Sequence, residues 1–163
     1  MTNRRQATRI SLAALSLAAV AAITGCGMMQ PSSTASSNSA AMSNMVAMST
    51  QLRGSNQVPP NASPATGTVD AVFNKDTSML RWKVSYSGLT GPATAGHFHG
   101  PAAAGANAGV VLPWSGAIAS PMEGSATLTP AQTADLMAGR WYANVHTAAN
   151  PGGEIRGQMM VRN

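Results

Sequence analysis

The chain has 163 residues, a formal net charge of +5 and one cysteine, and only 9% of its residues are charged. Three of its ten basic residues lie within the first nine positions, so the rest of the chain carries a net charge of about +2, and no later Lys/Arg cluster indicates nucleic acid binding. A lone cysteine excludes both an internal disulfide and a thiolate cluster that would hold a metal.

The N-terminus has the pattern of an export signal. Basic residues in the first nine positions precede an uncharged apolar run at 10–23, which is too short to span a bilayer comfortably. The run ends in Ile23-Thr24-Gly25-Cys26, which resembles a bacterial lipobox. We therefore expect a signal peptide over 1–25, lipidation of Cys26 and an exported protein anchored in a membrane. Gly27 in place of Asp favours the outer membrane or the periplasmic face. The alternative is a free thiol in an ordinary secreted protein.

Residues 26–43 are rich in Ser, Ala, Asn and Met without apolar periodicity, which predicts a flexible tether before a domain at 44–163. Met42, Met45 and Met48 recur every three residues at this junction. Thioethers select Cu(I), so the array is a secondary candidate for copper binding. The alternative is that these methionines are adaptable apolar residues.

The domain has the alternating pattern of short β-strands, at 46–53, 68–74, 78–87, around 97, 110–114, 122–128, 140–147 and 154–161. One helix is predicted from Pro130 to Ala138, with Thr129 as its N-cap and Gly139 as its stop. Short strands with regular turns predict an all-β, Greek-key sandwich with one short helix.

All three histidines lie in the most clearly patterned segments. His97 and His99 are two apart, so a strand places them on one face, and His146 shares a polar face with Tyr142 and Asn144. If the two strands are neighbours, three imidazoles converge on one patch outside the core. Such a set suits copper, with zinc as the alternative. In the competing interpretation the histidines are structural and hydrogen-bond the loops.

Glu154 and Arg156 share a face of the last strand. We expect a structural or supporting role for both, through a mutual ion pair or through loop amides, and a similar role for Asn144. The turn at Asn150-Pro151-Gly152-Gly153 requires glycine, and it is placed to position His146.

Several separated motifs together resemble the CHRD domain, a family named after chordin. They cover about 45–161 and include Ser87-Gly88-Leu89, Ala95-Gly96-His97-Phe98-His99-Gly100-Pro101-Ala102, Asn144-Val145-His146-Thr147 and Asn150-Pro151-Gly152-Gly153-Glu154-Ile155-Arg156-Gly157-Gln158. The resemblance implies an immunoglobulin-like β-sandwich but no secure activity. The chain departs from the family pattern at Gln57, where Glu is usual, and at Gly96, where Ala is frequent. A weaker, fold-level likeness to copper-zinc superoxide dismutases rests on the His-x-His pair and on Arg156.

These observations favour a lipid-anchored envelope protein that binds copper through His97, His99 and His146 for storage, delivery or protection. Its partners would be the membrane and an envelope protein or metal donor or acceptor, not nucleic acid. The alternative is an adhesion or interaction module with structural histidines. A dismutase-like enzyme is the weakest hypothesis, because the chain has no nucleophile motif, no paired carboxylates and no further histidines for a second metal.

Overall fold

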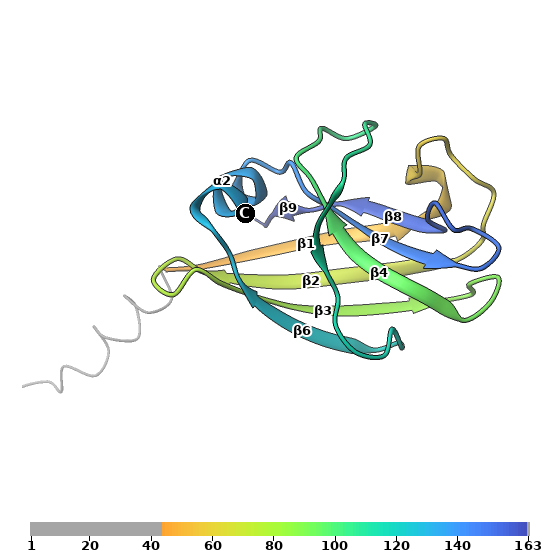
Figure 1. Cartoon of the computed structure of the whole chain (residues 1–163), viewed down its shortest axis with the longest axis horizontal. Coiled ribbons are helices and arrows are strands. Elements are labelled where there is room, and N and C mark those ends of the chain that lie inside the picture. The colour runs from red at the N-terminus through yellow and green to blue at the C-terminus, as the bar shows by residue number, and fades with distance from the viewer. Residues whose placement is uncertain (1–43, 163) are drawn as a thin grey trace, which may run out of the picture. The chain divides into compact units, whose positions relative to one another are not determined.

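The computed structural model describes residues 44–162, which form antiparallel strands and one short α-helix (Figure 1). The strands are β1 (Met45–Arg53), β2 (Thr66–Asn74), β3 (Met79–Ser87), β4 (Ala93–His99), β5 (Val110–Pro113), β6 (Met122–Thr127), β7 (Tyr142–Thr147), β8 (Ile155–Gln158) and β9 (Met160–Val161). A 3-10 turn, η1 (Gly54–Asn56), follows β1, and helix α2 (Pro130–Met137) precedes β7. Within residues 44–162, no helix has the length and apolarity needed to cross a membrane.

The strands form one curled sheet in the order β5-β4-β7-β8-β1-β2-β3-β6, and β9 pairs with β1. The two halves of this sheet face each other across the core. Phe98 on β4 packs edge-on against Trp82 on β3, with ring centroids 5.3 Å apart, although these strands are not neighbours in the sheet. The connections β3–β4, β5–β6 and β6–β7 cross between the halves (Figure 1). The prediction of an all-β, sandwich-like fold is therefore confirmed.

The alternating strands bury the side chains that their patterns indicate. Ala71 on β2 lies opposite Trp82 on β3, and both are buried. Leu80 and Val84 flank Trp82 on the same face and are fully buried, whereas Tyr86 at the strand end is only partly covered. The core lies between the halves of the sheet.

Helix α2 begins with a complete capping box. The Thr129 hydroxyl accepts a hydrogen bond from the backbone of Gln132, whose side chain accepts one from the Thr129 backbone. The helix ends at Met137, one residue earlier than predicted, because Ala138 leaves the helical conformation before Gly139 turns left-handed at φ 67°.

The polar face of β7 is not exposed to solvent. All six residues of this strand are buried, including Asn144 at 3% and His146 at 8% exposure. The sequence pattern indicated a polar patch outside the core, and the patch does lie outside the apolar cluster, but loops cover it. The segment 102–109 passes over one end of it and the turn at 150–153 passes over the other. The histidines therefore occupy a polar interior.

Gly96 leaves room for an aromatic side chain in the core. A Cβ at this position would overlap the six-membered ring of Trp114, which follows β5 and is 6% exposed. This contact gives a physical reason for glycine at position 96.

We expect Gly96→Ala to lower the free energy of unfolding by about 1–3 kcal/mol, because the added methyl displaces Trp114 in a packed core. Urea unfolding followed by tryptophan fluorescence measures the change. Gly109→Ala is the matched control, since a Cβ at Gly109 meets no atom within 4 Å. Equal stabilities of the two variants would contradict the prediction.

Candidate metal centre

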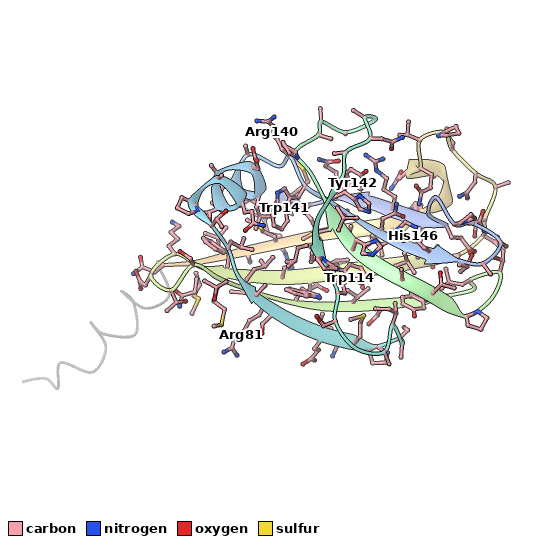
Figure 2. The ribbon with its side chains drawn as sticks, in the orientation of Figure 1. Arg81, Trp114, Arg140, Trp141, Tyr142 and His146 are labelled. Atoms are coloured by element: carbon pink, nitrogen blue, oxygen red, sulfur yellow. The ribbon has the colours of Figure 1, made fainter. Side chains whose placement is uncertain are left out.

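The structure brings the three histidines together from two neighbouring strands. β4 carries His97 and His99, and β7 carries His146, with Ala95 opposite His146 in the register. One ring nitrogen from each histidine lies within 4.8 Å of the other two. Tyr142 and His146 follow each other along β7 on the same face (Figure 2).

Two backbone carbonyls determine which nitrogens carry protons. His99 Nδ1 lies 3.1 Å from the Ala108 carbonyl oxygen, and His146 Nδ1 lies 3.0 Å from that of Pro151. A carbonyl oxygen only accepts, so each Nδ1 donates its hydrogen, and each neutral ring keeps its lone pair on Nε2. Metal-binding histidines are held in the same way in many proteins.

The free lone pairs face one region. His99 Nε2 is buried and has no hydrogen-bond partner among the described residues. His146 Nε2 lies 3.3 Å from His97 Nδ1, which must therefore be the donor in this arrangement. Two nitrogens bound tetrahedrally to one metal at about 2.0 Å would be about 3.3 Å apart. The observed spacing and the orphaned nitrogen fit a metal with three imidazole ligands, once His97 moves its proton to Nε2.

Burial favours the neutral form of His97 and His99, which ligation requires. It is the main influence that lowers the pKa of His99, and the hydrogen bond to Ala108 opposes it. Burial also lowers the pKa of His97, and its neighbour His146 lowers it further. At neutral pH His97 and His99 therefore offer lone pairs rather than positive charges.

His99 stacks on Tyr142, and Arg156 in turn lies over the Tyr142 ring. The His99 and Tyr142 rings are parallel within 3°, with centroids 4.8 Å apart. The Arg156 guanidinium carbon lies 3.4 Å from the Tyr142 ring centre. Since β7 lies between β4 and β8, Tyr142 links the histidine on one side to the arginine on the other.

One short loop segment, residues 106–108, forms hydrogen bonds with both ends of this stack. The Ala106 carbonyl and the Asn107 side-chain oxygen accept hydrogen bonds from Arg156, at 2.6 and 2.8 Å. The next residue, Ala108, bonds the Tyr142 hydroxyl as well as His99. The sequence analysis placed Tyr142 on the polar face but gave it no role beside His99. It could not indicate the loop carbonyls, because backbone carbonyls in a Gly/Ala-rich loop leave no side-chain signal.

Glu154 joins three segments of the polar interior. Its carboxylate is fully buried and accepts hydrogen bonds from the hydroxyls of Ser63, Thr90 and Thr147 and from the Thr90 backbone. Burial alone would raise its pKa, but these hydrogen bonds together lower the pKa to about 2. Of the two roles predicted for Glu154 and Arg156, contacts with loops are observed, and no ion pair joins them within residues 44–162.

The remaining predicted site residues are not assembled with the histidines. Met45 and Met48 lie on opposite faces of β1, 44% and 1% exposed, so these two thioethers do not share a site. Met42 and Cys26 lie outside the described residues, as do the predicted signal peptide and tether. Asn144 is buried beside His146 in the strand and accepts a hydrogen bond of 2.7 Å from Gln57. Gly153 has φ 122°, the positive value for which the turn was predicted to need glycine, and a Cβ there would meet the Asn144 amide.

Fold and site together define a β-sandwich protein with a three-histidine group in which loops bury His99 and His146 and His97 is half-buried. The family model of the CHRD domain matches residues 48–159, and the chain belongs to this family. No curated protein and no solved structure matches the chain. The likeness to superoxide dismutases therefore stays a prediction.

Proposed function

We propose that this protein binds one copper ion through His97, His99 and His146, and that it stores, delivers or sequesters copper in the cell envelope. The observation that carries the proposal is the orientation of the rings. Loop carbonyls hold the Nδ1 protons of His99 and His146, so that the Nε2 lone pairs are left for a ligand, and one of them has no partner among the described residues.

The donor set favours copper over zinc. Three imidazole nitrogens suit either ion, but Cu²⁺ binds nitrogen ligands more tightly than Zn²⁺ in the general affinity order. The nearby aromatic ring of Tyr142 and the hydrogen-bonded loops support a fixed geometry. With three protein ligands, coordination positions remain open for transfer to a partner or for solvent.

The cellular setting rests on the N-terminal sequence. We propose that Cys26 carries the lipid anchor and that residues 26–43 tether the domain to the membrane, on the periplasmic face or at the outer membrane. A tethered binding domain would collect copper at the envelope and exchange it with another envelope protein.

Elemental analysis of the full chain tests the metal proposal. We expect one copper per chain after loading with Cu²⁺ and extensive dialysis, with nitrogen hyperfine structure in the electron paramagnetic resonance spectrum from imidazole ligands. Equimolar Zn²⁺ should not displace the copper. Protein that loses both metals on dialysis would contradict the proposal and would favour structural histidines in an interaction module.

A further inference from the structure

Within residues 44–162, Arg156 is a buried cation without a carboxylate partner. Its side chain is 2% exposed, and its guanidinium contacts one amide oxygen, one carbonyl and the Tyr142 ring. Burial lowers its pKa, which indicates that water does little to stabilise the charge. A buried charge is normally paired, because moving it out of water costs several kcal/mol.

The chain supplies no side-chain counter-charge for this arginine. It has only five acidic residues, and each is engaged elsewhere. Asp70 pairs with Arg162, Asp76 with Asn44, Glu123 with Lys83, Asp135 with Arg140, and Glu154 with three hydroxyls. In the part of the chain that the structure describes, the positive charge of Arg156 is therefore balanced by dipoles and an aromatic face.

Arg156 also lines a cavity of about 670 Å³ between the η1 segment and the 100–109 loop. This volume is typical of sites for small molecules. The other lining residues are uncharged and mostly polar or small, namely Thr50, Gln51, Ser55, Asn56, Gln57, Val58, Pro60, Ala104, Gly105 and Gln158. Amides and hydroxyls provide hydrogen bonds, and no acidic side chain in the lining would repel an anion.

We infer that this cavity is a binding site for a small anionic ligand that carries a carboxylate or phosphate group, with Arg156 as its charge partner. The ligand would supply the negative charge that the chain lacks, and Ser55 and the amides would orient its remaining oxygens. The inference is independent of the metal proposal, since the cavity lining includes none of the histidines.

Titration of the full chain with inorganic phosphate and with succinate, each against chloride at constant ionic strength, tests the inference. The protein is first freed of metal on a chelating resin, so that no bound ion captures the anions. We expect saturable shifts of the Arg156 Nε–H signal and of the Gly105 amide in ¹H–¹⁵N spectra for one or both anions, with a midpoint in the millimolar range or below. The two titrations distinguish a phosphate site from a carboxylate site.

Two variants and one control complete the test. Arg156→Gln should abolish the saturable shift at Gly105. Gln57→Glu places a carboxylate in the same cavity, so it should weaken anion binding at least tenfold while the protein stays folded. Arg81→Gln, which removes an exposed arginine of β3 (Figure 2), should bind as the original chain does. No saturation with either anion, or equal binding by the original chain and the Gln57→Glu variant, would overturn the inference.

Discussion

His99→Ala is expected to weaken copper binding by at least about 100-fold. Loss of even a residue that only supports a metal ligand typically weakens affinity 10- to 100-fold, and His99 offers the nitrogen that has no other partner in residues 44–162. Two imidazoles would remain, too few to hold the ion against dialysis. Competition with a chelator of known copper affinity measures the change.

His97→Ala tests the same site with a variant that should not disturb folding. His97 is more exposed than His99, so its removal should leave the fold intact, and copper affinity should fall by a similar factor. Gly109→Ala, which keeps all three histidines, should bind copper as the original chain does. Folded His97→Ala and His99→Ala proteins with unchanged affinity would show that the histidines are not ligands.

Glu154→Gln is expected to remove about 3 kcal/mol of stability at pH 7. The carboxylate has a pKa of about 2 in the folded chain, below its ordinary value of 4.5, so it favours the folded state only where it is ionised. This stabilisation is complete above pH 4.5 and is lost as the pH falls toward 2. The original chain should therefore lose stability across this range, whereas the variant should change much less.

Urea unfolding at pH 7, 4 and 2.5 measures both effects. Glu123→Gln is the matched control, because Glu123 forms only a surface ion pair of 3.6 Å with Lys83 and should change stability by less than about 1 kcal/mol. If Glu154→Gln behaves like this control at pH 7, the buried carboxylate does not hold the three segments together.

The strands and the helix could be predicted because their residues obey local rules. Alternation placed Leu80, Trp82 and Val84 on the buried face of β3, and the Thr129 cap marked the start of α2. The polar cover of β7 could not be predicted, because it depends on where distant loops pass. Those loops contribute backbone carbonyl groups, and because every residue has one, the sequence does not show which carbonyls will bind the histidines.

The candidate site could be predicted only where it depends on local spacing and strand pairing. The spacing of His97 and His99 set them on one face, and pairing of β4 with β7 brought His146 to them. The partners of Glu154 come from three separate segments of the chain, and their convergence has no local pattern. Whether Glu154 and Arg156 would pair stayed open from sequence, and hydroxyl groups and loop oxygens settle it in the structure.

Residues 106–108 constrain how this protein can diverge during evolution. The Ala106 carbonyl and the Asn107 side chain bond the Arg156 guanidinium, and Ala108 bonds the His99 imidazole, so a single insertion or deletion among them would misalign both at once. The preceding tip at 103–105 is exposed, but Ala104 and Gly105 also line the cavity beside Arg156, so a change of length there should alter anion binding. Any lineage that loses the spacing of 106–108 should therefore lose Arg156 and His99 together.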